Sequence, residues 1–338
     1  MFRLRQPSTR YCCVITTLVL LLVTQLAADD PRSLNVLSFN ILQGGGNAAN
    51  VGFVDQDFGG SRLREIAALI RFTKADLVGI QEDVGNDQLL RLLGEGWFRS
   101  GSVYARFPLT LISHAQYLTV VRMHLPDQTA VVIVNCHWAP SRYGPFHAQE
   151  LLQQGELLGD TNAFADEVLK YAGKPQGPRG YDSTLKALQP LLNAGETLFL
   201  TGDFNEPSHL DWTARYQQQG RSRWPGAPAD RPLRQQVAWP GSMRLEQAGM
   251  QDAYRVVKPD EVKFPGITWT PQYPAGTPGR REYSAQVLDR IDMIYFRSDR
   301  FHPRQASVVG EASEFTDLVW PGRWPSDHRA VLVQFVSK

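Results

Sequence analysis

Short apolar runs recur along most of the chain, and several of them alternate apolar with polar positions. Runs of this kind that are rich in Val, Ile, Leu and Phe and bounded by turn residues predict β-strands. We expect strands at residues 34–41, 76–82, 109–113, 117–125, 130–138, 197–204, 267–271, 287–296 and 328–336. The three runs between residues 109 and 138 follow one another closely, which indicates a meander.

Fewer segments have the spacing of a helix. Apolar residues recur at helical spacing in residues 61–72, and Ser61 can cap the first turn. A long helical region begins near Phe146 and continues to about Leu192 with a break at GKPQGPRG, and a short helix is expected near DQLLRLLG. Residues 213–240 are expected to form loops. Most of the predicted elements are strands, and two helical regions interrupt them. This order predicts an α/β domain of mixed sheets covered by helices.

The first 28 residues differ in composition from the rest. Three arginines precede an uncharged apolar stretch that ends at Leu26-Ala27-Ala28. This order predicts a cleaved signal peptide at residues 1–28 and a secreted or periplasmic protein, and an uncleaved membrane anchor is the alternative. The remaining residues, 29–338, contain no linker-like stretch and are expected to form one domain.

Cleavage would change both the charge and the cysteine content. It would move the formal net charge from +1 to −2 and would leave Cys136 as the only cysteine. Cys136 lies in an apolar strand, so we expect a buried thiol and no internal disulfide.

Polar side chains stand at or near the ends of several predicted strands. They are Asn40, Glu82, His137, Asp203, Asn205, Asp289, Asp292, Asp327 and His328. Each has a simple structural explanation when taken alone, such as a turn, a solvated strand end, a core histidine or an ion pair with Arg290. Together they predict a pocket of crowded carboxylates, which repel one another and are costly to desolvate. Such a cluster needs a cation.

The types of side chain narrow the choice of cation. Carboxylate and amide oxygens suit Mg²⁺, with Mn²⁺ or Ca²⁺ as alternatives. His137 and His328 lack the HExxH spacing of zinc proteases. A Mg²⁺ site held by few carboxylates leaves positions for water and phosphate oxygens, so the sequence predicts phosphoryl chemistry.

The motifs at these positions resemble those of the endonuclease/exonuclease/phosphatase superfamily, which includes pancreatic-type deoxyribonucleases and neutral sphingomyelinases. From about Leu34 to Phe335 the family's segments occur in its order, as SFNI, GIQE, YARFPL, NCHWAP, GDFNEP, RIDMIY and SDHRAV. The resemblance implies a four-layer α/β sandwich of two mixed, mainly antiparallel sheets flanked by helices. It also implies a metal-dependent phosphoric ester hydrolase: a phosphodiesterase, a phosphatase or a nuclease.

The resemblance also suggests roles for residues around the metal and the attacking water. Glu82 resembles the main metal ligand, with Asn40 beside it and Asp327 as a further contributor. Asp203 resembles the residue that orients or deprotonates the water, and Asn205 resembles a hydrogen-bond donor to the phosphate. Asp203 and Asn205 are two positions apart, so in an extended chain their side chains would share one face.

A second group of residues resembles the part of the family's site that stabilises charge. His137 and His328 are similar to the pair that acts on the phosphorane-like state and the leaving group. Asp292, in preference to Asp289, is similar to the acid that orients His328. The family's Ser-Arg-Tyr-Pro segment is Ala-Arg-Phe-Pro at residues 105–108, so we expect no catalytic role there.

Two features near the site bear on the substrate. Residues 213–235 carry five arginines and one acid, and Arg221 and Arg223 are expected to bind substrate phosphate unless this segment is a solvated insertion. Trp324 precedes a proline close to Asp327 and is expected at the substrate, with core packing as the alternative.

These observations predict a secreted, divalent-metal-dependent phosphodiesterase that acts on a small phosphodiester or another small phosphorylated substrate. The slightly acidic mature chain has no second basic patch to flank a duplex, which favours a small substrate over nucleic acid. A non-specific nuclease of the same fold and a catalytically silent binding protein remain alternatives. No stable membrane anchor is expected, and the sequence leaves the oligomeric state open.

The signal peptide can be tested on the exported protein. N-terminal sequencing of secreted material should give a mature chain that starts between Ala28 and Pro31. A full-length species that only detergent extracts would support the membrane anchor instead.

Overall fold

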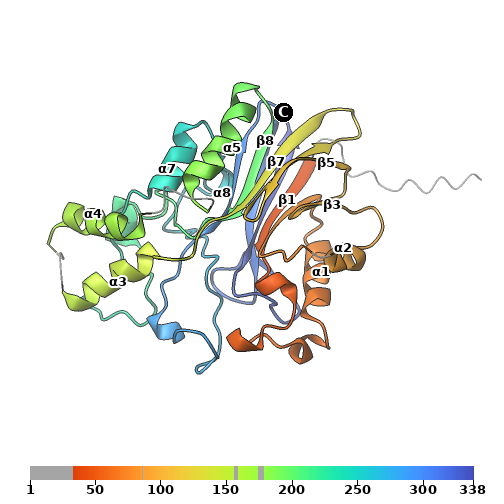
Figure 1. Ribbon diagram of the computed structural model, residues 1–338. Coiled ribbons are helices and arrows are strands. Elements are labelled where there is room, and N and C mark those ends of the chain that lie inside the picture. Colours follow the sequence, from red (N-terminus) through yellow and green to blue (C-terminus); the bar gives the residue numbers. More distant parts are fainter. Residues whose placement is uncertain (1–32, 86, 156–158, 174–178) are drawn as a thin grey trace, which may run out of the picture. The chain divides into compact units, whose positions relative to one another are not determined.

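The computed structural model describes residues 33–85, 87–155, 159–173 and 179–338. The predicted signal peptide at residues 1–28 lies outside these residues, and so does most of the predicted helix break at residues 173–180. Two β-sheets form the centre of the described part, and helices lie on either side of them (Figure 1).

The larger sheet has seven strands in the order β12-β11-β13-β1-β2-β4-β3. Its strands are β1 (Ser33–Asn40), β2 (Leu77–Gln81), β3 (Phe98–Ser100), β4 (Val103–Ala105), β11 (Phe301–Gly310), β12 (Leu318–Val319) and β13 (Ala330–Ser337). Neighbouring strands are antiparallel except for the pairs β1–β2 and β11–β12.

The smaller sheet has six strands in the order β5-β6-β7-β8-β10-β9. Its strands are β5 (Leu109–Ala115), β6 (Leu118–His124), β7 (Ala130–His137), β8 (Leu198–Asp203), β9 (Gln251–Asp252) and β10 (Asp292–Arg297). Only β7 and β8 pair in parallel. Both sheets are therefore mixed and mainly antiparallel, as predicted.

Apolar packing defines the layers. Side chains of both sheets, among them Val36, Leu77, Ile133 and Phe199, share one buried cluster, so the sheets face each other. A second cluster joins β1 and β2 to α1 (Arg62–Phe72) and α2 (Gln88–Leu93). A third joins β7 and β8 to α5 (Tyr181–Asn193) and α7 (Pro240–Gln247). Helices, sheet, sheet and helices give the four-layer α/β sandwich expected from the sequence (Figure 1).

The other helices belong to long connections between strands. They are α3 (Gly144–Gln154), α4 (Thr161–Ala172), α6 (Ala214–Gln219) and α8 (Ala253–Val257), and short 3₁₀ turns occur at Gln43–Gly45, Ala49–Val51, Asp55–Phe58 and Tyr283–Ala285. The predicted helical region from Phe146 to Leu192 is thus three helices. The first two end at Gly155 (φ 76°) and Gly173 (φ 31°), in the left-handed conformation that commonly ends helices.

Three strand predictions need correction. Residues 267–271 form no strand but one isolated bridge, between Trp269 and Asp289, and Pro271 has no N–H with which to extend it. The predicted strand 287–296 begins only at Asp292. The long strand β11 went unpredicted because Pro303 and the charged or polar residues around it interrupt the apolar pattern, and a register shift follows Pro303.

Strand register brings the predicted site residues to one end of the sheets. In the six-stranded sheet, Asp203 at the end of β8 pairs with His137 of β7 on one side and with Asp292 of β10 on the other. In the seven-stranded sheet, Asn40 at the end of β1 pairs with Gln81, the residue before Glu82. The fold therefore places residues far apart in the sequence at neighbouring strand ends.

A buried polar layer joins the two sheets below these strand ends. The side-chain oxygen of Asn135 in β7 accepts hydrogen bonds from Gln81 Nε2 at 2.7 Å and from Thr201 Oγ1 at 2.9 Å. Its amide nitrogen donates to the carbonyl of Ile80 at 2.7 Å. Gly79 of β2 faces this layer, and a Cβ there would lie 1.9 Å from Thr201 Oγ1. The close approach of the sheets at this point requires glycine.

We therefore expect Gly79→Ala to lower the free energy of unfolding by about 1–3 kcal/mol, because the added methyl group forces the polar layer apart. Chemical denaturation monitored by tryptophan fluorescence would measure the change. Gly46→Ala is the matched control, because a Cβ at Gly46 meets nothing within 4 Å. An effect of equal size in the two variants would contradict this account.

Candidate active site

Asp203 lies at the centre of the polar cluster and is 1% exposed. Its Oδ2 accepts a hydrogen bond from Asn40 Nδ2 at 2.9 Å and lies 3.4 Å from His137 Nε2 and 3.8 Å from His328 Nε2. Its Oδ1 accepts from the backbone N–H of Asn205 at 2.9 Å. One carboxylate thus connects residues from both sheets.

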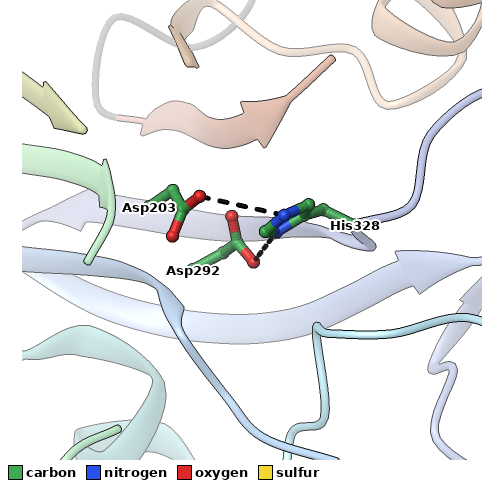
Figure 2. Close-up of side chains that lie close together, drawn as sticks. All are labelled: Asp203, Asp292 and His328. Carbon is green, nitrogen blue, oxygen red and sulfur yellow. Dashed lines mark hydrogen bonds and ion pairs between the residues drawn. The ribbon is translucent and has the colours of Figure 1, made fainter. Parts of the chain in front are cut away.

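Asp292 and His328 form a buried pair beside Asp203. Figure 2 shows the two carboxylates and the imidazole turned toward one another from separate segments of the chain. His328 Nδ1 lies 2.9 Å from Asp292 Oδ2, so Asp292 is the acid that bonds this histidine. Asp289 lies elsewhere: it accepts from Tyr143 Oη at 2.9 Å and from Trp212 Nε1 at 3.0 Å.

The carboxylates around His328 determine its charge. Burial disfavours the imidazolium, but Asp292, Asp203 and Asp327 outweigh it and raise the pKa of His328 to about 10. Burial raises the pKa of Asp292 to about 6, against the opposing effect of His328. Near neutral pH the pair is therefore a carboxylate and an imidazolium.

His137 has the opposite tendency. Burial lowers its pKa below the ordinary value of 6.5, Asp203 opposes this effect and Arg179 adds to it. Nε2 of His137 lies 3.3 Å from Arg179 Nη2, which can only donate, and 3.4 Å from the Asp203 carboxylate, which can only accept. The lowered pKa favours a neutral ring that accepts from Arg179. The two histidines thus differ in charge.

Asn40 connects Asp203 to Glu82. Asn40 Nδ2 also donates to Glu82 Oε1 at 3.2 Å, and Asn40 Oδ1 accepts from the N–H of Leu42 at 3.0 Å. Glu82 Oε2 accepts from the N–H of Gln43 at 2.6 Å. Glu82 has a φ of 61°, which is uncommon for a residue with a side chain and occurs often at functional sites.

Two sets of residues are candidates for holding a metal ion. Atoms of Asp203, Asp292 and His328 lie within 4.8 Å of one another, so this group could hold a cation. A protonated imidazole has no lone pair to offer, however, and the raised pKa of His328 argues against its use as a ligand. The alternative is Glu82, whose carboxylate offers the oxygen atoms that Mg²⁺ and Ca²⁺ prefer. Asn40 turns its Nδ2 toward Glu82, and its Oδ1 accepts from a backbone N–H, so it orients the Glu82 carboxylate.

Asp327 is held by a residue that the sequence did not indicate. Its Oδ2 forms an ion pair with Arg280 Nη1 at 2.7 Å, while its Oδ1 is buried and has no hydrogen-bond partner among the described residues. That free oxygen is compatible with the predicted contribution to a metal or to metal-bound water.

A cavity of about 720 Å³ opens beside these residues. Glu82 and His137 line it together with Tyr117 and Arg179. The Arg179 guanidinium lies 4.0 Å from the centre of the Tyr117 ring and donates to the carbonyl of Trp138 at 3.2 Å. The cavity therefore borders the polar cluster on its Glu82 and His137 side.

Comparison with known proteins identifies the family. The family model described as "Endonuclease/Exonuclease/phosphatase family" matches residues 33–328. This chain belongs to the endonuclease/exonuclease/phosphatase family. An uncharacterized protein of Caenorhabditis elegans is 23% identical over 326 residues, with 90% of this chain and 91% of that protein covered.

The chain is also similar over most of its length to solved structures that are more distant in sequence. A mannosyl-6-phosphatase of Bacteroides thetaiotaomicron is 15% identical with a TM-score of 0.47, and the match covers 90% of this chain and 99% of that one. The catalytic domain of human Nocturnin with bound sulfate is 14% identical with a TM-score of 0.46, and the match covers 91% and 95% of the two chains. Within the described residues, no helix is long and apolar enough to cross a bilayer.

Three residues of this chain that were predicted to bind substrate need correction, because the structure places them in other contacts. Arg223 is 2% exposed and pairs with buried Asp289 at 3.5 Å, so its charge is used inside the protein. Arg221 is exposed but forms an ion pair with Glu314, away from the cluster around Asp203. Trp324 is 8% exposed and packs in the core beside Phe39, so core packing is its role.

Asn205 departs from the extended geometry expected of it. Its φ is 45°, so the chain turns immediately after β8, and its backbone N–H bonds back to the Asp203 carboxylate. The side-chain amide donates to the carbonyl of Trp138 at 3.1 Å. Asn205 therefore stays near Asp203 through an Asx-type turn, not through the alternation of a strand.

Arg62 supports the site although no sequence motif marks it. It is fully buried, and its guanidinium donates to the carbonyls of Gly46, Ile41 and Leu42, which follow β1, and to that of Pro325, which precedes Asp327. Burial lowers its pKa to about 10, against the effect of nearby carboxylates. One side chain thus ties together the two segments that carry Asn40 and His328.

The opposite behaviour of the two histidines gives a test. In a ¹H–¹⁵N NMR titration of metal-free protein, His328 should stay protonated up to about pH 10, and His137 should be neutral at pH 6.5. Asp292→Asn removes the main carboxylate beside His328 and leaves the cost of burial, so the pKa of His328 should fall by several units. An unchanged pKa of His328 in that variant would contradict the pairing.

Proposed function

We propose that this protein is a divalent-metal-dependent phosphoric ester hydrolase that cleaves a small phosphodiester by in-line attack of water. One observation carries the proposal: Asp203 lies within 4 Å of two histidines of different charge and is bonded to Asn40, which also bonds Glu82. A structural role alone gives no reason to crowd these ionisable groups at a cavity, whereas phosphoryl transfer uses every one of them.

The attack would use Asp203 as its base. The carboxylate is held in place by Asn40 Nδ2 and by the N–H of Asn205, so it can accept the proton of a water molecule without moving. The oxygen of that water forms the new bond to phosphorus as the bond to the leaving oxygen breaks.

The charge that develops would be stabilised by His328. Asp292, next to Nδ1, keeps the imidazolium charged. Nε2, on the opposite side of the ring, lies 3.8 Å from Asp203 Oδ2. This nitrogen can donate to the phosphoryl oxygens or protonate the departing oxygen. His137 is neutral and, with Arg179, would help to position the phosphate. A divalent cation held by Glu82, which Asn40 orients, would polarise the P–O bond and offset the negative charge of the phosphate.

The cavity favours a small substrate. Arg179 Nη2 lies 3.3 Å from His137 Nε2, whereas Arg99, the other arginine that lines the cavity, is already paired with Asp83 and Asp87. The arginine-rich segment that supported a nuclease does not contribute, because Arg223 is buried and Arg221 is paired with Glu314. A long polyanion would need a basic surface that extends well beyond one phosphate.

Hydrolysis of bis-p-nitrophenyl phosphate by the purified protein tests the proposal. We expect turnover with Mg²⁺ or Mn²⁺ and none after metal stripping in EDTA, because the cation that would polarise the P–O bond is then absent. Asp203→Asn should lower kcat roughly 10²-fold or more, since it removes the base.

Asp230→Asn is the matched control, because the Asp230 side chain is 76% exposed and, among the described residues, forms an ion pair only with its neighbour Arg231. Thermal unfolding of each variant would separate lost chemistry from lost structure. Full activity of the stripped protein in EDTA, or wild-type turnover in a folded Asp203→Asn variant, would refute the mechanism.

A further inference from the structure

A second cavity, of about 780 Å³, lies apart from the catalytic cluster. Arg221 and Arg223 of the arginine-rich segment line it, with Lys263, Phe315 and Arg329 from three other segments. None of the residues predicted for catalysis or metal binding lines this cavity. Arg329 directly follows His328 of the catalytic cluster in the sequence, but its guanidinium donates to Glu311 and to the carbonyl of Ile267.

The cavity has a surplus of positive charge. The charge of Arg223 is compensated by Asp289, and that of Arg329 by Glu311. Neither of these two acids lines the cavity. Arg221 is exposed and shares its charge with the exposed carboxylate of Glu314. Lys263 is exposed and forms no ion pair with any described residue. About one positive charge at the rim is therefore available for a ligand.

Flat and apolar surfaces form the rest of the cavity. Tyr216 and Ile267 are buried in its wall, and Phe315 is half-buried. The Arg223 guanidinium lies 4.0 Å from the centre of the Tyr216 ring, and that of Arg329 lies 5.6 Å from the centre of the Phe315 ring. Arg223 Nε is buried without a hydrogen-bond partner among the described residues. Such a combination of rings, cations and an unpaired donor is typical of a ligand pocket.

We propose that this cavity is a second binding site, separate from the active site, for an organic anion with a ring-shaped apolar body and a single negative charge. The ring would pack against Tyr216, Ile267 and Phe315. The anionic group would lie at the rim, between Lys263 and Arg221, where it would compete with Glu314 for the arginine. Both cations sit on exposed segments, so the ligand can enter from solvent.

Isothermal titration calorimetry with 1-naphthoate, in EDTA, tests the site. The Glu82→Gln variant is used beside wild type, so that binding at the catalytic centre is recognised. We expect one naphthoate site in both proteins, and about tenfold or greater weakening in the double variant Arg221→Gln/Lys263→Gln, because hydrogen bonds to charged groups are lost. Arg231→Gln is the matched control: it belongs to the same segment but contacts the carbonyl of Gln153, outside the cavity.

The ligand's two parts are tested separately. 1-Naphthalenemethanol has the ring without the charge and acetate has the charge without the ring, and each should bind at least tenfold more weakly than 1-naphthoate. Equal binding of the neutral alcohol, unchanged affinity in the folded double variant, or no binding of naphthoate at all would overturn the proposal. Binding that Glu82→Gln abolishes and the double variant retains would assign naphthoate to the active site and would also overturn it.

Discussion

The position of β8 between β7 and β10 determines the site. Hydrogen bonding on both sides of β8 aligns Asp203 with His137 in parallel register and with Asp292 in antiparallel register. Because side chains alternate between the two faces of a strand, a slip of one residue in either pairing would turn one of these side chains to the opposite face. The apolar residues earlier in β8 prevent such a slip, since Leu198 and Leu200 pack toward α5 while Phe199 packs between the sheets. Core packing therefore sets the geometry of the candidate site.

Local patterns predicted much of this arrangement. The strands that carry Asn40, Glu82, His137 and Asp203 have long apolar runs, and a polar residue at the end of such a run is visible in the sequence. The resemblance of IDMIY to the family's motif favoured Asp292 over Asp289 as the acid beside His328, and the structure pairs Asp292 with His328 at 2.9 Å. Positions at strand ends can be predicted because they depend on the residues beside them.

Long-range contacts explain what the sequence did not reveal. An arginine in a polar loop is expected to be exposed, but Arg223 is buried, and Asp289, distant in the chain, pairs with it in the interior. Arg179 lies in a Gly- and Pro-rich break that looks like a simple connection, yet the fold returns it to His137. Arg62 lies in an amphipathic helix, where polar residues are common and none stands out. Its four carbonyl partners lie in loops that carry no recognisable sequence motif. Each of these roles depends on tertiary contacts, which propensities and periodicity do not encode.

The central position of β13 in its sheet has a consequence for synthesis on the ribosome. β13 pairs with β1 on one side and β11 on the other, so the larger sheet stays in two separate pieces until residues 330–337 have been made. The carbonyl of Pro325, which Arg62 holds, and the imidazole of His328 are translated only shortly before that strand. A nascent chain can therefore pair β7 with β8 early, but it can assemble the polar cluster around Asp203 only once the segment with His328 has been made. Until then the edges of β1 and β11 are open to wrong partners, which makes this stage the most exposed to aggregation and the one at which a chaperone would matter most.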